Sequence, residues 1–457
     1  MTIDEEVLLL RQENEELKKQ LKAALALIAE LEKRRDPPSF VKANRPKPTE
    51  PKATRKKRAQ EHNHGRLKME PTRIERHALD RCPDCNYQLQ GESVDYKREV
   101  IEIPEPQPVE VIEHQVIKRW CPKCESWRTP KLDLADQVLD QGRIGLQTSS
   151  LVAYLRISLR LTIRQIVIYL KTLHNLRLSI GQVVEILHRL SAKFTPLVAN
   201  LKAQARASPI LHADETGWRE NGLNGYIWAF STPGEEAVRY YEYDRSRGQG
   251  VVKRILDDEF KGHLVTDFYA GYNIYSGAHQ RCWVHLLRDL HALKEEHSSN
   301  DEVVAWAQAV RDLYDEGQRW LSENKELNTQ EREAQYVSLL TRMRELALVH
   351  AKAYEHACNT LAKRLLRHED EMFQFVLIPG LSADNNLAER SVRPLVVIRK
   401  ISGGSRSEKG SKTRMTLSSL FATWQVRGIN PFSECLKILI QTHAPQTSAP
   451  QISAPLF

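Results

Sequence analysis

The chain has 457 residues, more than one ordinary hydrophobic core serves, so we expect several domains. With 41% hydrophobic residues and no apolar run near the roughly 20 residues that cross a bilayer, the composition favours a cytoplasmic globular protein over a membrane protein. The formal net charge is +8, and Lys and Arg gather at residues 36–81 and 387–414. Two basic stretches favour a polyanionic partner such as nucleic acid, although a solvated surface explains either stretch alone equally well.

Residues 1–35 carry a leucine-zipper-like heptad pattern. Its a and d positions are Val7, Leu10, Asn14, Leu17, Leu21, Ala24, Ile28 and Leu31. A polar residue at one a position favours a parallel, in-register pair, so we expect a coiled coil that forms a homodimer or a larger assembly. The alternative is an amphipathic helix packed on its own chain, since the run is barely four heptads.

The next segment, residues 36–76, is rich in Pro, Lys and Arg and has almost no large apolar side chains. Such a composition buries too little surface to fold, so we expect a basic, extended linker. Its RKKR run suits contact with DNA and suits simple solvation equally well.

Two CxxC pairs, CPDC and CPKC, lie in residues 77–130. They supply Cys82, Cys85, Cys121 and Cys124. Four thiolates in two pairs match a tetrahedral structural zinc site, with free thiols or a redox pair as the alternative. The 35 residues between the pairs contain VDYKREVIEI and VEVIEHQVIKRW, which predict two strands around a proline-bearing turn that would bring the pairs together.

Residues 140–207 have a helical pattern. LVAYLRISLRLTIRQIVIYLKTL and SIGQVVEILHRLSAKF predict amphipathic helices joined at HNLRLS, with Ser179 as the N-cap of the second. This arrangement suits a helix-turn-helix DNA-binding domain, and a plain helical hairpin in a core fits the periodicity as well.

Residues 208–400 begin with four short β-type runs, ILHADETGW, GYIWAFST, AVRYYEYD and GHLVTDFYAGY. A long helical region follows at about 286–376. The chain then returns to ADNNLAERSVRP, and residues 401–440 predict a basic Gly/Ser loop and further helices.

Three carboxylates in this region suit metal chemistry. Asp214 and Asp267 each follow an apolar strand run, and Glu389 lies on a later helix. Each aspartate alone is more simply a turn-starting residue. Together the three supply hard oxygen ligands for Mg²⁺ or Mn²⁺, which support in-line displacement at phosphorus.

Four ordered blocks, HADETGW, TDFYAGY, CWVHLLRDL and DNNLAERSVRP, resemble those of IS66-family insertion-sequence transposases. The zipper-like start, the four cysteines and the terminal SLFATWQVRGINPF extend the resemblance over essentially the whole chain. It implies a multi-domain α/β protein whose RNase H-like core is interrupted by an all-α insertion. It also implies a DDE triad at Asp214, Asp267 and Glu389 that cuts and joins DNA in the prokaryotic cytoplasm, at the nucleoid, with small accessory proteins from the same element as partners.

Other residues near the triad have two interpretations each. Basic side chains beside Glu389 suit DNA phosphates or a solvated face, and we favour DNA for Arg390, Arg393, Arg399 and Lys400. We expect Glu215 to be a surface or capping carboxylate.

Cys282 and His285 have CxxH spacing, for which core packing is the simpler explanation than a metal. Asn386 with Glu389 has capping-box spacing and predicts a helix start there. Asp289 stands where the family tends to have a basic residue, which weakens the case for a DNA contact at that point.

Two other functions fit the same residues. One is a non-catalytic, domesticated DNA-binding protein that uses the zinc and helical segments. The other is an RNase H-like nuclease without strand transfer, which would leave nicks and no joined strands.

Overall fold

The computed structural model describes residues 14–25, 70–324 and 328–441, and the chain divides into two units, Met1–Ile103 and Pro104–Phe457. In the first unit, residues 14–25 form a helix on which Leu17, Leu21 and Leu25 are exposed. The rest of the heptad pattern and most of the 36–76 segment lie outside the described residues, so the coiled coil and the linker stay predictions.

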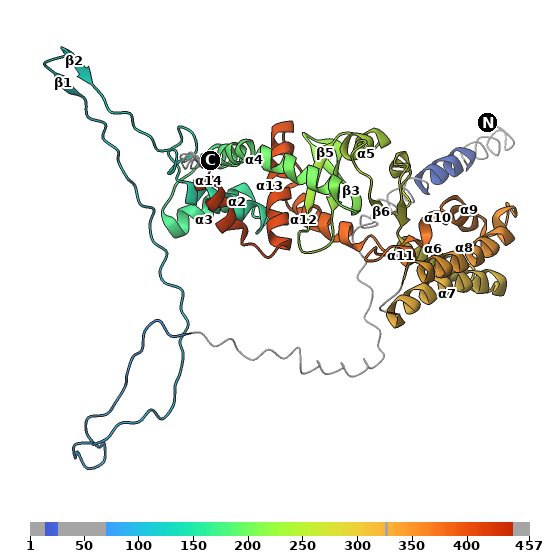
Figure 1. The fold of residues 1–457 in the computed structure, drawn as a ribbon, viewed down its shortest axis with the longest axis horizontal. Coiled ribbons are helices and arrows are strands. Elements are labelled where there is room, and N and C mark those ends of the chain that lie inside the picture. The colour runs from blue at the N-terminus through green and yellow to red at the C-terminus, as the bar shows by residue number, and fades with distance from the viewer. Residues whose placement is uncertain (1–13, 26–69, 325–327, 442–457) are drawn as a thin grey trace, which may run out of the picture. The chain divides into compact units, whose positions relative to one another are not determined.

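The second unit contains a five-stranded sheet in the order β5-β4-β3-β6-β7 (Figure 1). Its strands are β3 (Ile210–Glu220), β4 (Leu223–Ser231), β5 (Arg239–Asp244), β6 (His263–Thr266) and β7 (His279–Arg281). The β3-β4 and β4-β5 pairs are antiparallel, whereas β6 runs parallel to both β3 and β7. The four β-type runs of the sequence therefore form β3 to β6, and β7 is an additional strand that lies just before the expected helical region.

Alternation along β4 explains why both faces of the sheet are covered. Ile227 and Ala229 pack in one apolar cluster with residues of α12 (Asn386–Ser402) and α13 (Glu408–Val426). Trp228 and Phe230 point the other way, into a larger cluster that includes α5 (Gln249–Leu256). Successive side chains of a strand face opposite sides, so a strand buried on both faces has a nearly continuous apolar sequence.

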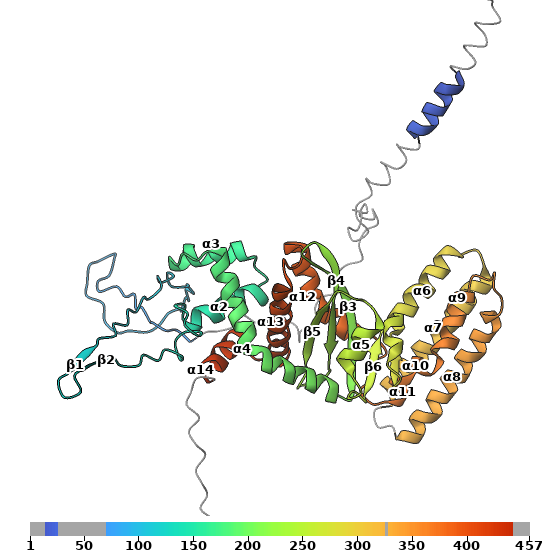
Figure 2. The ribbon, with the colours of Figure 1, turned by 90° about the horizontal axis from the view of Figure 1, so that it is seen from above.

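Four helices form the part of the unit next to β5: α2 (Leu146–Ile157), α3 (Ile163–His174), α4 (Ile180–Ala207) and α14 (Pro431–Gln441). Ser179 caps α4 in a capping box with Gln182, which confirms the predicted N-cap. The expected first helix is two helices, α2 and α3, and Thr162 caps the second of them with Gln165. In Figure 2, α4 runs from this group of helices to the sheet.

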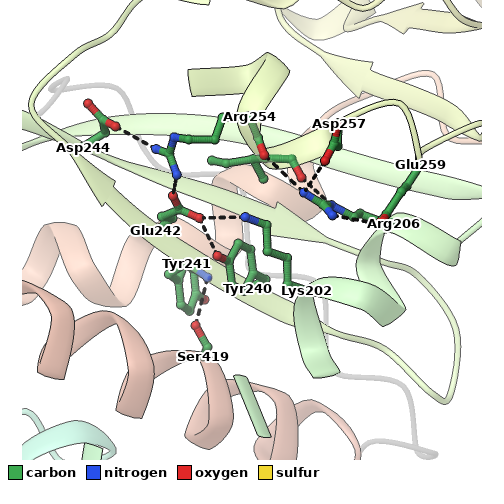
Figure 3. A network of polar contacts seen from close by, with 11 residues as sticks. Lys202, Arg206, Tyr240, Tyr241, Glu242, Asp244, Arg254, Asp257, Glu259 and Ser419 are labelled. Atoms are coloured by element: carbon green, nitrogen blue, oxygen red, sulfur yellow. Dashed lines mark hydrogen bonds and ion pairs between the residues drawn. The ribbon is translucent and has the colours of Figure 1, made fainter. Parts of the chain in front are cut away.

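A polar network fixes α4 and α5 to β5 (Figure 3). Glu242 on β5 accepts a hydrogen bond from Tyr240 and forms ion pairs with Lys202 of α4 and Arg254 of α5. Arg206 near the end of α4 donates to the carbonyl of Ile255 at 2.7 Å. Both helices are thus attached to the edge strand by charged hydrogen bonds as well as by apolar packing.

Residues 283–377 form a separate helical group beyond β7. Its helices are α6 (Trp283–Glu296), α7 (Asp301–Glu323), α8 (Thr329–Ala351), α9 (Asn359–Arg367), α10 (Glu369–Met372) and α11 (Gln374–Leu377). They enclose their own apolar cluster, which includes Trp283, Val310 and Met343. In Figure 2 they lie on the opposite side of the sheet from α2, α3 and α14.

The two strands expected between the cysteine pairs are wrong. Residues 94–103 and 109–118 have no regular secondary structure, and only β1 (Arg119–Cys121) and β2 (Ser126–Arg128) form a short hairpin. Val100 and Val111 are exposed, because no neighbouring sheet face buries the apolar side of the alternation.

Among the described residues, no helix has both the length and the apolar character needed to span a membrane.

Candidate active site

The parallel pairing of β3 with β6 places two of the predicted carboxylates side by side. His212 of β3 is the register partner of Val265 of β6. Continuing this register by two residues aligns Asp214 with Asp267, which directly follows β6. Adjacent parallel strands end at the same edge of a sheet, which is where open α/β sheets gather functional groups.

Asp267 is held by a buried arginine of β7. Arg281, which is 1% exposed, donates from Nη1 to the carbonyl oxygen of Asp267 at 3.0 Å and from Nη2 to Asn273. Its Nε bonds the carboxylate of Glu371 in α10. The Asp267 carboxylate itself accepts the backbone N–H of Tyr269 at 2.9 Å. Both the backbone and the side chain of Asp267 are therefore fixed from the following loop and strand.

Asn385 joins the third carboxylate to the other two. Its Nδ2 donates to the carbonyl oxygen of Ala213, directly before Asp214, at 2.8 Å, and its Oδ1 accepts from Nδ1 of His212 at 3.2 Å. Its backbone carbonyl accepts the N–H of Glu389 in the first turn of α12. Asn385 is 1% exposed, so these bonds are made in a dry environment, where they are strongest.

The pKa of Asp214 is shifted by its surroundings. Burial, followed by the negative charges of Glu215 and Asp267, raises the pKa of Asp214 to about 7. The charge of Glu389 adds to this rise in the pKa of Asp214. A carboxyl group that is buried among other carboxylates binds its proton tightly unless a cation compensates the charge.

Glu389 also faces a CxxH pair at the start of α6. Its Oε1 lies 3.9 Å from Nδ1 of His285, and neither buried atom has a hydrogen-bond partner. Ligand atoms of Cys282, His285 and Glu389 lie within 4.8 Å of one another. The thiol of Cys282 accepts the backbone N–H of Asn385, so it belongs to the same support as α12. One Glu389 oxygen is thus buried and unsatisfied, as expected for a group that binds something absent from the chain itself.

The two cysteine pairs form matching turns in separate units. Cys82 and Cys85 lie in the first unit, where Asn86 follows with φ 58°, and Cys121 and Cys124 lie in the second, where Glu125 follows with φ 45°. Backbone N–H groups of Cys85 and Asp84 lower the pKa of the Cys82 thiol. Those of Cys124 and Lys123, together with the Cys124 thiol, lower the pKa of Cys121. Such turns favour the thiolate, which is the form that binds metals.

Comparison with protein families gives two matches. Residues 141–413, more than half of the chain, match the model described as Transposase IS66 family. The chain belongs to the IS66 transposase family. Residues 80–125, which include all four cysteines of the two pairs, match the zinc-finger binding domain of transposase IS66. Membership of this family indicates a transposase, and the zinc-finger match indicates zinc binding.

Two curated proteins from Sinorhizobium fredii (strain NBRC 101917 / NGR234) resemble this IS66-family chain. The uncharacterized protein y4qI is 27% identical over 205 residues, which are 42% of this chain and 38% of the relative. The uncharacterized protein y4jO is 30% identical over 167 residues, which are 36% of this chain and 49% of the relative. The matched part therefore spans less than half of either relative.

The basic residues proposed for DNA differ in their surroundings in this IS66-family protein. Arg390 and Arg393 are exposed on α12, as is Lys400 near its end. Arg399 is partly buried, and its Nη1 bonds the carbonyl oxygen of Gly217 and the hydroxyl of Thr216 on β3. Arg399 therefore attaches α12 to the sheet, whatever its remaining donors contact.

Of two smaller expectations, one is wrong and one is confirmed. Glu215 is not a surface residue: its side chain is 3% exposed, and it accepts bonds from Arg247 at 2.6 Å and from the Tyr272 hydroxyl at 2.6 Å. The helix start predicted there is confirmed, because α12 begins at Asn386 with Asn385 in the N-cap position, and no capping box with Glu389 forms. The Asn385 side chain is used on β3 instead, and Asp384 accepts the N–H of Asn386 at 2.9 Å.

The supporting residues had no signal in the sequence. Asn385 lies within a predicted block, but its partners His212 and Ala213 are 173 and 172 positions away along the chain. Arg281 lies in β7, between the last predicted strand and the predicted helical region. Asp289, the departure from the family pattern, forms an ion pair with Arg364 of α9 and so stabilises the helical group.

Replacing Asn385 with alanine will destabilise the protein by about 2–3 kcal/mol, because it leaves the buried Ala213 carbonyl and the His212 ring without their partners. Urea denaturation measures the free energy of unfolding. The matched control is Asn386→Ala, one position along, where the side chain is only partly buried and the cost will stay below about 1 kcal/mol. Equal costs for the two variants would remove Asn385 from its supporting role.

Asp214→Asn will stabilise the metal-free protein at pH 8 by roughly 2–4 kcal/mol relative to wild type, as an upper range for a pKa raised from 3.8 to about 7. The folded state binds the Asp214 proton more tightly than the unfolded state, so wild-type stability falls as pH rises from about 4 to about 7. At pH 4 most of the advantage disappears, since the wild-type carboxyl is then neutral. Unfolding in urea with EDTA at both pH values measures this, and an advantage that does not change with pH contradicts it.

Proposed function

We propose that this IS66-family protein is a DNA transposase that cuts element ends and joins them to target DNA by metal-dependent phosphoryl transfer. The observation that carries the proposal is the cluster of Asp214, Asp267 and Glu389. Parallel strands align the first two, Asn385 ties the third to Asp214, and the charges of Asp267 and Glu389 act on the Asp214 carboxyl. The sheet that bears them would be an RNase H-like core, and α6 to α11 its helical insertion.

The three side chains fit a divalent cation. All three ligands are carboxylates, which suit Mg²⁺ or Mn²⁺, and a buried Glu389 oxygen has no hydrogen-bond partner within the protein. The raised pKa of Asp214 also supports a cation, because a positive charge would offset the burial and the neighbouring negative charges that raise this pKa. When bound, such ions activate a water or a 3′-hydroxyl and stabilise the leaving oxygen.

The chain's own residues set the geometry for this chemistry. Arg281 fixes the backbone at Asp267, so that carboxylate does not follow the movement of the loop after β6. Arg247 and Tyr272 hold Glu215 next to Asp214 with three hydrogen bonds. We propose that Glu215 supports Asp214 and is not itself a metal ligand, since both of its oxygens already have partners.

The DNA would lie across α12. Arg390, Arg393 and Lys400 place positive charge on the exposed side of the helix whose first turn carries Glu389, and phosphate oxygens are the natural partners of such a row. We propose that Arg399 also contacts DNA, although its main role is to attach α12 to β3.

Other parts of the chain would recognise the DNA and assemble the protein on it. We propose that the four paired cysteines bind one structural zinc ion and that α2 to α4 act as a helix-turn-helix-like DNA-binding domain. A homodimer or larger assembly would form through the N-terminal heptads. Small accessory proteins from the same element are further proposed partners, and the recognised ends and target would be DNA in the prokaryotic cytoplasm.

Asp214→Asn, Asp267→Asn and Glu389→Gln will each reduce strand cleavage by about 10³-fold or more in Mg²⁺, with DNA binding retained, because each removes one ligand charge. The assay uses labelled element-end DNA together with any accessory proteins that wild type requires. Asp258→Asn is the matched control, an exposed aspartate outside the cluster, and it will keep wild-type cleavage. Unchanged cleavage in any one of the three would remove that residue from the site.

The same assay separates the other two functions. Nicked products without joined strands would indicate an RNase H-like nuclease. Metal-independent binding without cleavage by wild type, under conditions where a related element is active, would indicate a non-catalytic DNA-binding protein.

A further inference from the structure

A second group of metal-binding side chains lies in the helical insertion, where α7, α8 and α9 meet. We refer to it as the corner cluster, and its members are Glu302, His350, His356 and Cys358. We propose that the corner cluster binds a zinc ion, with one carboxylate, two imidazoles and one thiolate as ligands.

The donors converge from three helices. Glu302 lies in the first turn of α7, His350 in the last turn of α8, and Cys358 is the residue before α9. One ligand atom from each of His350, His356 and Cys358 lies within 4.8 Å of the others. A single ion there would hold the ends of three helices together, which is the usual work of a structural zinc.

The carboxylate of Glu302 completes the cluster. Its Oε1 lies 3.9 Å from Nε2 of His350 and 3.8 Å from Nε2 of His356. These distances exceed a hydrogen bond, and they approach the roughly 3.4 Å that separates two donors sharing one zinc at 2.0–2.1 Å. Nε2 of His356 is buried and has no hydrogen-bond partner.

The surroundings are already rigid. Asn359 donates to the carbonyl oxygens of His350 and Ala351 at 2.8 and 3.0 Å, which closes the C-terminus of α8. The Trp306 ring packs edge-on against His350. Cys358 is fully buried and His350 is 4% exposed, so two of the four donors are held in place by packing.

Zinc binding at neutral pH would require one proton to leave the cluster, that of the Cys358 thiol. Burial, followed by the charge of His356, lowers the pKa of His350, so its ring is a neutral ligand. Burial and the charge of Glu302 raise the pKa of Cys358 to about 11, which keeps the free thiol protonated. Zinc binding would replace the S–H bond with a zinc–sulfur bond and release that proton to solvent.

One rearrangement accompanies binding. The rings of His350 and His356 are stacked, with centroids 4.0 Å apart and planes at 5°, so their lone pairs run parallel. Nδ1 of His356 accepts the backbone N–H of Cys358 at 3.2 Å, which places the proton of the neutral ring on Nε2. Ligation through Nε2 therefore needs that proton to move to Nδ1, with the ring turned so that Nδ1 no longer accepts from Cys358, a local change at a side chain that is 22% exposed.

The zinc content of the full chain tests the proposal. After dialysis against a zinc-buffered solution, native mass spectrometry counts the ions on wild type, Cys358→Ala and His356→Gln. Each variant will carry one zinc ion fewer than wild type. Cys435→Ala is the matched control, a fully buried cysteine in α14 outside the cluster, and it will keep the wild-type count. Cys82→Ser identifies the ion that belongs to the paired cysteines.

Equal zinc counts for wild type, Cys358→Ala and His356→Gln would overturn the proposal. A Cys82→Ser variant that binds no zinc ion at all would overturn it as well. Circular dichroism reports whether Cys358→Ala is folded. If it is not, His356→Gln decides, because that side chain is partly exposed and its replacement leaves the core intact. None of these counts depends on DNA cleavage, so the result stands apart from the proposed transposase activity.

Discussion

The side-chain amide of Asn385 is the connection on which the candidate active site depends. The sequence places Asp214 on β3 and Glu389 on α12, with the whole helical insertion between them. Asn385 closes that distance with a donor to the carbonyl next to Asp214, and its own carbonyl begins the helix that carries Glu389. Because the amide is buried, any movement of α12 away from β3 leaves polar groups unsatisfied. The helical insertion can therefore move without separating Asp214 from Glu389.

The hydrogen bonds of Asn385 hold together a cluster of carboxylates that is electrostatically unfavourable by itself. Burial and neighbouring negative charge raise the pKa of Asp214 to about 7, and one oxygen of Glu389 is buried without a partner. Functional sites commonly contain such unfavourable electrostatics, which the rest of the fold stabilises. Arg281 and the Arg247–Glu215 pair supply part of that stabilisation, since each brings a positive charge to the loops around the carboxylates. These features are the basis for proposing that the site binds a cation.

Local patterns in the sequence predict the strands and the helix that carry the carboxylates. Features that depend on long-range contacts are not predicted. Alternation and apolar runs were sufficient for β3 and β6, because a strand buried on both faces has a characteristic sequence over a few residues. The three residues of β7 are too few to show any period, so the sequence predicts no strand at Arg281. Residues 94–103 alternate well but have no sheet to pair with. Neither the role of Asn385 nor the burial of Glu215 is visible locally, since their partners come from distant segments.

The central claim is that Asp214, Asp267 and Glu389 bind divalent metal together. A crystal structure of the protein with Mn²⁺ and element-end DNA, with anomalous scattering to locate manganese, tests it most directly. We expect anomalous density within about 2.2 Å of carboxylate oxygens from all three residues, including the buried Glu389 oxygen that has no hydrogen-bond partner in the protein. Manganese bound elsewhere, or a Glu389 carboxylate that contacts no ion while DNA occupies the site, would contradict the account.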